Sequence, residues 1–145
     1  MNKDNSQTKE MFDSISNEYD FINNLITFGS HKKWKKEIFE ISKKIKPKKI
    51  LDLATGTADI AIELSALENC EIIGTDISSK MLRIGKSKIE DLNLNEKIIL
   101  EKGDAENLKY KDRTFDVVTI GYGVRNFTNL KNSLKQVYRV LKKDG

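Results

Sequence analysis

Four short polar clusters, each following an apolar run, hold the residues best suited to chemistry. They read DLATGTAD (52–59), GTD ending at Asp76, KGDAE around Asp104, and GYGVRNF (121–127). Gly56 has no Cβ, so a ligand can approach the backbone there, and Thr57 offers a hydroxyl close to the start of the next predicted helix. Asp76 follows Asp52 by 24 positions, a spacing typical of a carboxylate that accepts hydrogen bonds from both ribose hydroxyls and repels a 2′-phosphate.

The third cluster is suited to a purine base. Asp104 can accept a hydrogen bond from an adenine amino group, and Ala105 leaves room for the ring. Each feature also has an ordinary structural interpretation, since ATGT can be a simple turn and Asp76 a helix N-cap. Because three such signals occur at three successive strand ends, we expect an adenosine-containing ligand.

The first cluster bears on which adenosine ligand this is. A nicotinamide dinucleotide usually requires GxGxxG, whereas the corresponding positions here are Ala54, Gly56 and Asp59. Asp52 and Asp59 would repel a pyrophosphate but suit the sulfonium and ammonium groups of S-adenosylmethionine. S-adenosylmethionine is therefore the expected cofactor, and a dinucleotide is the alternative.

Alternating short apolar runs and longer amphipathic segments must position these clusters. The predicted strands are 48–53, 70–76, 97–104 and 114–122, and the predicted helices are 58–67, 78–92 with a serine N-cap, and 129–141. This order favours an α/β, Rossmann-like, doubly wound, mostly parallel sheet with right-handed crossovers. Ligands bind such sheets beyond the carboxyl ends of the strands, where the four clusters lie. In the last helix we expect an apolar face of Leu130, Leu134, Val137 and Leu141.

The two ends of the sequence depart from the alternation of strands and helices seen between them. Apolar spacing predicts helices over 10–28 and about 31–45, which end before Pro47, so we divide the chain into a helical appendage or lid (1–46) and a main domain (47–145). The sequence ends after the helix 129–141, where a further strand is expected, so we expect the domain to lack its C-terminal strands here. The fourth strand would then be an open edge, which favours a homo-oligomer.

Composition restricts the classes of partner. The 145 residues carry a formal charge of +4, but the lysines are interspersed with acidic residues, and no basic patch with stacking aromatic residues indicates nucleic acid. Cys70 and His31 are the only residues of their kinds, so we expect neither a disulfide nor a metal site. No apolar run reaches the roughly 20 residues that a membrane span needs. We therefore expect a cytoplasmic protein, one that would meet any lipid substrate at the inner face of the membrane.

Several stretches resemble motifs of class I S-adenosylmethionine-dependent methyltransferases. They are ILDLATGTAD, GTDISSKML, GDAENLKYKDRTFDVV and YRVLKKDG. Tyr19 to Trp34, together with GVRNF, is similar to signatures of the menaquinone and ubiquinone C-methyltransferase family. The resemblance implies methyl transfer to a ring carbon of a polyprenyl hydroquinone. Two alternatives stay open: the same fold acting on another small molecule, and a non-catalytic fragment that binds the cofactor.

The resemblance also implies roles for individual residues. The cofactor contacts fall on Thr57, Asp76, Asp104 and Ala105, while Gly121 stands where the family often has serine, which removes a side-chain contact. Ala58 replaces the usual loop glycine, which is tolerated if its φ is negative.

The proposed catalytic side chains follow the fourth strand or belong to the N-terminal signature. Arg125 would stabilise a phenolate, with Asn126 beside it, and Tyr122 and His31 are secondary candidates. His31 and Tyr19 could close over the site as a lid. Trp34 is expected in the core.

Overall fold

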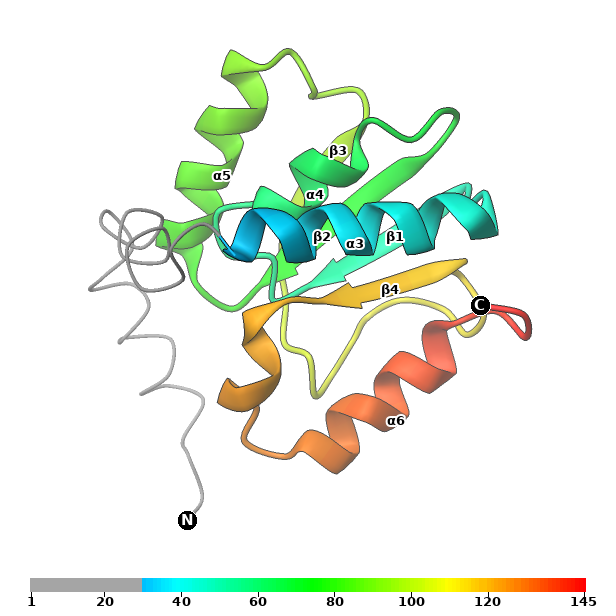
Figure 1. Ribbon diagram of the computed structural model, residues 1–145. Coiled ribbons are helices and arrows are strands. Elements are labelled where there is room, and N and C mark those ends of the chain that lie inside the picture. Colours follow the sequence, from blue (N-terminus) through cyan, green and yellow to red (C-terminus); the bar gives the residue numbers. More distant parts are fainter. Residues whose placement is uncertain (1–29) are drawn as a thin grey trace.

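The computed structural model describes residues 30–145, drawn in colour in Figure 1. Its elements are α3 (Ser30–Ile45), β1 (Lys49–Leu53), α4 (Asp59–Leu64), β2 (Glu71–Asp76), α5 (Ser79–Asp91), β3 (Ile98–Lys102), β4 (Val117–Ile120), the 3₁₀ helix η1 (Tyr122–Asn126) and α6 (Leu130–Val140). The predicted helix 10–28, with Tyr19, lies outside the described residues.

The four strands form one parallel sheet in the order β3-β2-β1-β4. Asp52 of β1 is in register with Gly74 of β2 on one side and Thr119 of β4 on the other. The chain builds outward from β1 through β2 to β3 and then returns to the opposite side of β1. This reversal of strand order confirms the predicted doubly wound sheet and locates the switch point between β1 and β4, where such sheets bind ligands.

Helices cover both faces of the sheet. Figure 1 shows α3, α4 and α5 on one face and α6 on the other. Successive strand residues alternate between two apolar clusters, so Ile50 and Ile72 join one cluster while Leu51 and Ile73 join the other. The strands are therefore buried from both sides, which explains why they appear in the sequence as continuous apolar runs.

All four predicted strands and the three helices after residue 47 are present, but several are shorter than expected. β4 has four residues, and α4 ends at Leu64. Ser78 caps α5 as predicted, because its side chain accepts a hydrogen bond from the Met81 amide.

The predicted apolar face of α6 is wrong at its first two residues, whereas Val137 packs against the core as expected and Leu141 is half-buried. Leu130 and Leu134 are 42% and 50% exposed, whereas Ser133 and Val140 are fully buried. Ser133, Val137 and Val140 also follow helical spacing, so the sequence pattern fits either face and tertiary packing decided between them.

Helix α3 packs onto the domain as part of a layer. Ile38 and Phe39 contact the apolar cluster beneath α4, and Ser42 is buried. Trp34 is 50% exposed, so the expectation that it lies in the core is wrong. The division of the chain at residue 46 stays a prediction, since most of the proposed appendage lies outside the described residues.

The strand β4 forms one edge of the sheet. Among the described residues it pairs with β1, and just before its start a single parallel bridge joins Phe115 to Leu141. Its residues Val117, Val118 and Ile120 are half-buried. In residues 30–145, no helix combines the length and apolar character that a membrane span requires.

Candidate functional site

The loop between β1 and α4 has an unusual backbone. Ala54, Gly56 and Ala58 all have left-handed φ values, of 55°, 59° and 69°. A non-glycine residue in this region costs about 1–2 kcal/mol, so the neighbouring structure must hold the loop in place. The condition set for Ala58, a negative φ, is not met: this alanine is the N-cap of α4 in a left-handed conformation.

Asp76 supports the first half of the loop. Its two carboxylate oxygens accept hydrogen bonds from the backbone N–H groups of Gly56 and Ser78, each over 2.8 Å. The Thr55 amide also donates to the Thr75 carbonyl, over 3.0 Å. These bonds fix the carboxylate at the carboxyl end of β2, beside the glycine.

Asp52 lies deeper than expected. It is 1% exposed, and its carboxylate accepts hydrogen bonds from the hydroxyls of Thr55 (2.6 Å) and Thr119 (2.7 Å). Burial raises the pKa of Asp52 to about 6, although both hydroxyl bonds oppose the rise. The fold thus uses this carboxylate to join β1, the loop and β4, and does not present it at the loop surface.

Asp59 is engaged by lysines. Its carboxylate lies 2.7 Å from Nζ of Lys88 on α5 and 4.0 Å from Nζ of Lys35 on α3. Lys88 also donates to the hydroxyl of Thr57 over 3.1 Å, and Thr57 is 3% exposed. Lysines from two helices therefore neutralise the carboxylate of Asp59 that was predicted to face the ammonium group of a ligand.

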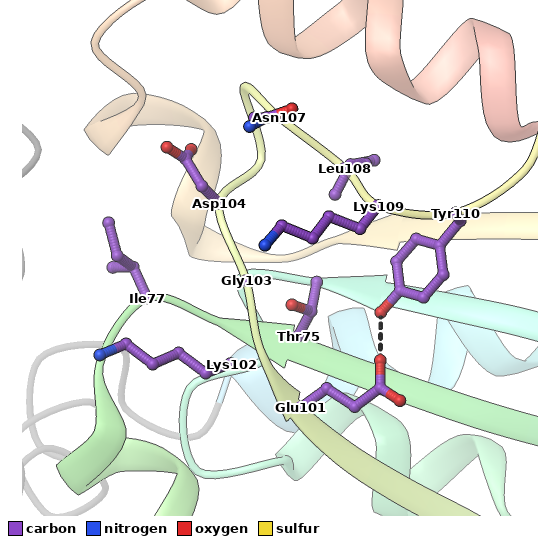
Figure 2. A pocket seen from close by; sticks show the side chains of 10 residues that line it. All are labelled: Thr75, Ile77, Glu101, Lys102, Gly103, Asp104, Asn107, Leu108, Lys109 and Tyr110. Carbon is purple, nitrogen blue, oxygen red and sulfur yellow. Dashed lines mark hydrogen bonds between the residues drawn. The ribbon is translucent and has the colours of Figure 1, made fainter.

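The segment after β3 borders a cavity of about 620 Å³, a volume typical of small-molecule sites. Figure 2 shows Asp104 and Ile77 toward one end and Tyr110, whose hydroxyl donates to Glu101 over 2.7 Å, toward the other. Asp104 is oriented by the Glu106 amide, which donates to its Oδ1 over 2.9 Å, and Ala105 is partly buried against the core.

Glu106 joins this segment to the next. Its side chain accepts a hydrogen bond from the Asn129 amide over 2.8 Å, and its carbonyl accepts one from the Asn132 side chain over 2.9 Å. The loop after β3 and the start of α6 are therefore held together.

The segment after β4 lies against the first loop. A methyl group placed on Gly123 would overlap Cβ of Ala54, and one placed on Gly121 would lie 2.6 Å from Cδ1 of Ile60. Glycine at both positions thus allows η1 to approach the loop and α4. A serine at 121 would require Ile60 to move.

The structure describes the side chains of two of the four candidate catalytic residues. Arg125 is exposed and Asn126 is half-buried, both in η1 beyond the carboxyl end of β4. Tyr122 begins η1 and His31 lies in the first turn of α3, but their side chains are outside the described part of the structure. Among residues 30–145, no cluster of histidine, cysteine or acidic side chains could hold a metal ion.

The whole chain, residues 1–145, matches the ubiE/COQ5 methyltransferase family. The chain belongs to this family. It is 38% identical to a demethylmenaquinone methyltransferase of Bacteroides fragilis over 99% of this chain and 59% of that protein. It is 40% identical to a protein of the same name from Thermotoga maritima, again over 99% of this chain and 60% of that protein. The chain therefore spans about three fifths of the length of these relatives.

A solved structure agrees with this assignment. The crystal structure of a candidate S-adenosyl-L-methionine-dependent methyltransferase from Methanococcus maripaludis superimposes with a TM-score of 0.66 at 25% identity, covering 79% of this chain and 60% of that chain. The sheet order and the family match together confirm the predicted methyltransferase fold.

Sequence reasoning missed Lys88, Thr55 and Thr119. Lys88 lies in the last turn of α5 among other charged residues, and the two threonines are ordinary β-branched residues in or beside strands. Their roles depend on which side chains meet in space, and no spacing along the chain reveals that.

Proposed function

We propose that this chain binds S-adenosyl-L-methionine and belongs to an enzyme that methylates a ring carbon of a polyprenyl hydroquinone. The observation that carries the cofactor part is the Asp76 carboxylate at the carboxyl end of β2, which two backbone N–H groups orient beside Gly56 in the loop that follows β1. The hydroquinone part comes from the family and from the names of the relatives at 38–40% identity.

The residues of the site fit this cofactor. A Cβ at Gly56 would meet nothing within 4 Å, so the space above this residue is open to a ligand. Asp76 would accept hydrogen bonds from the ribose hydroxyls, and Asp104 would accept one from the adenine amino group. Ala105 and Ile77 would border the ring, and Thr57 would support the loop near the methionine end.

On the acceptor side, residues of this chain would orient the ring and activate it. S-adenosyl-L-methionine supplies an electrophilic methyl group on a sulfonium that leaves as a neutral thioether. Arg125 would stabilise the phenolate of the hydroquinone, which raises electron density at the ring carbon that attacks the methyl group, and Asn126 would help orient the ring. The methylated ring carbon would then lose its proton to a base, which restores the aromatic ring as a phenolate, and protonation of the phenolate oxygen would return the hydroquinone. Tyr122 and His31 are the remaining candidates for proton transfer.

The cofactor proposal can be tested by calorimetric titration of the chain with S-adenosylhomocysteine. We expect Asp76→Asn to weaken binding by about tenfold or more, because hydrogen bonds to a charged group are worth about 1.5–3 kcal/mol. Asp116→Asn is the matched control, since Asp116 also accepts two backbone N–H bonds, from Lys48 and Lys49, but at the opposite end of the sheet. Its affinity should equal that of the wild type. A folded wild-type chain that binds NADH and not S-adenosylhomocysteine would point to the dinucleotide alternative.

The acceptor is tested separately, by following methyl transfer to a demethylmenaquinol analogue and to unrelated small-molecule acceptors. We expect methyl transfer to the quinol analogue and to none of the other acceptors. Arg125→Met should lower the rate of this transfer about tenfold or more. Turnover of another acceptor would favour a different methyltransferase of the same fold. Cofactor binding without turnover of any acceptor would support a binding fragment.

A further inference from the structure

We call the loop between β1 and α4, residues 54–58, the cofactor loop. Helix α5 contacts its second half, residues 57–58, through Gly85 and Lys88, which lie on one face of the helix. A Cβ on Gly85 would lie 3.2 Å from Cβ of Ala58 and 3.2 Å from the carbonyl carbon of Thr57. The glycine thus lets the helix backbone approach the loop closely. Lys88 follows three residues later, and residues three apart share a helix face.

Lys88 makes two contacts from this position. Its Nζ donates to the Thr57 hydroxyl over 3.1 Å and to Oδ1 of Asp59 over 2.7 Å. The Lys88 side chain is 28% exposed and that of Asp59 is 42% exposed, so the pair is partly shielded from water. The ammonium therefore links the last residues of the loop and the first residue of α4 to the neighbouring helix.

The second half of the loop contains a strained residue that needs support from its neighbours. Within the loop, the Ala58 amide donates to the Thr55 carbonyl over 3.0 Å. Asp76 holds Gly56, and Asp52 holds Thr55, both in the first half. In the second half, Ala58 is a left-handed N-cap, and α4 begins without a side-chain cap hydrogen bond. A strained backbone of this kind persists only where its surroundings hold it, and Lys88 supplies a bond on each side of Ala58.

We propose that Lys88 is a positioning residue for the cofactor, which holds Thr57 and Asp59 so that the loop keeps its binding conformation before the ligand arrives. The proposal rests on the proposed cofactor function. It assigns Asp59 to the support of the loop, in place of the predicted contact with the ligand ammonium. A loop that is already ordered loses less conformational entropy on binding, so the expected effect is on affinity.

The test compares the dissociation constant of S-adenosylhomocysteine with the melting temperature for variants of the full 145-residue chain. Lys88→Met keeps the aliphatic part of the side chain and removes the ammonium. We expect about fivefold weaker binding, the factor that corresponds to losing one ordinary hydrogen bond. Lys88→Arg keeps the charge and should bind within about twofold of the wild type.

Lys97→Met is the matched control. Lys97 donates to the Ser65 carbonyl over 2.9 Å, so it supports the far end of α4 in a comparable way without touching the loop. It should change the melting temperature by a similar amount and leave the affinity unchanged.

The outcomes separate the two proposals. If the folded wild-type chain does not bind S-adenosylhomocysteine, the cofactor function itself fails. If the wild type binds and Lys88→Met binds equally well, only the role of Lys88 fails. Equal weakening by Lys97→Met, or loss of cooperative unfolding in Lys88→Met, would show a general structural role and overturn the inference.

Discussion

Thr119 of β4 donates its hydroxyl to Oδ1 of Asp52 on β1 over 2.7 Å, at a point where the two residues are in register. With Thr55 donating to the other oxygen over 2.6 Å, a buried carboxylate is held between two hydroxyls at the base of the loop between β1 and α4. This arrangement joins the two strands that flank the switch point, and it makes stability depend on pH.

Asp52→Asn should change that pH dependence. Burial raises the pKa of Asp52 from 3.8 to about 6 in the folded chain, so the folded state binds this proton more tightly than the unfolded state. The stability contributed by the proton is complete below about pH 4 and is lost as the pH rises through 6. Relative to Asp52→Asn, the wild type should lose about 2.4 kcal/mol of unfolding free energy between pH 4 and 7. Urea denaturation across this range measures the difference.

Thr119, whose hydroxyl donates to Asp52, provides a second test of the titration of this carboxyl group. Thr119→Val removes a hydrogen bond that lowers the pKa of Asp52, so the fall in stability should extend to higher pH. Parallel pH profiles for the wild type and Asp52→Asn would contradict the assignment.

Gly74→Ala should disturb the loop through the sheet. A Cβ there would lie 2.6 Å from Cδ2 of Leu100 and 2.9 Å from the Thr55 hydroxyl oxygen. We expect a loss of about 2 kcal/mol in unfolding free energy from overpacking. Gly56→Ala meets no atom within 4 Å but has a φ of 59°, so it should cost about 1 kcal/mol from backbone strain alone. Chemical denaturation of both variants ranks the two effects, and a larger cost at Gly56 would contradict this reasoning.

The face that α6 buries can be tested by a pair of substitutions. Leu134 is 50% exposed, so Leu134→Gln should change the unfolding free energy by less than about 0.5 kcal/mol. Val140 is fully buried, so Val140→Ala should cost about 2 kcal/mol. Thermal or urea unfolding checks both, and the reverse order would restore the apolar face expected from the sequence.

The single cysteine should be unreactive until the chain unfolds. Cys70 is 6% exposed, and burial, with nearby Asp116 and Glu71, raises the pKa of its thiol to about 11. Because the thiolate is the reactive form, labelling by a disulfide reagent at pH 8 should be about a hundredfold slower in the native state than in urea. Equal rates in the two states would show that the thiol is accessible in the folded protein.

Much of the framework could be predicted from local patterns. Strand and helix periodicity, the serine N-cap of α5 and the order of the elements depend on residues near one another in sequence, and these predictions are confirmed. The convergence of four clusters then follows from topology, since parallel strands present their carboxyl ends on one side. In this way Gly56 and Asp76, 20 residues apart, were expected at one site, and they are hydrogen-bonded.

What the sequence alone determined is thus the fold class and the edge of the sheet at which a ligand would bind, because both follow from short-range periodicity and strand order. Only the tertiary structure decided whether each predicted carboxylate is buried, paired or exposed. Asp52 is buried between two threonines, and Asp59 is paired with Lys88. It also decided the buried face of α6 and the left-handed Ala58. These outcomes depend on packing and electrostatics between residues distant in sequence, where several arrangements satisfy the same local pattern and only the assembled neighbours distinguish them.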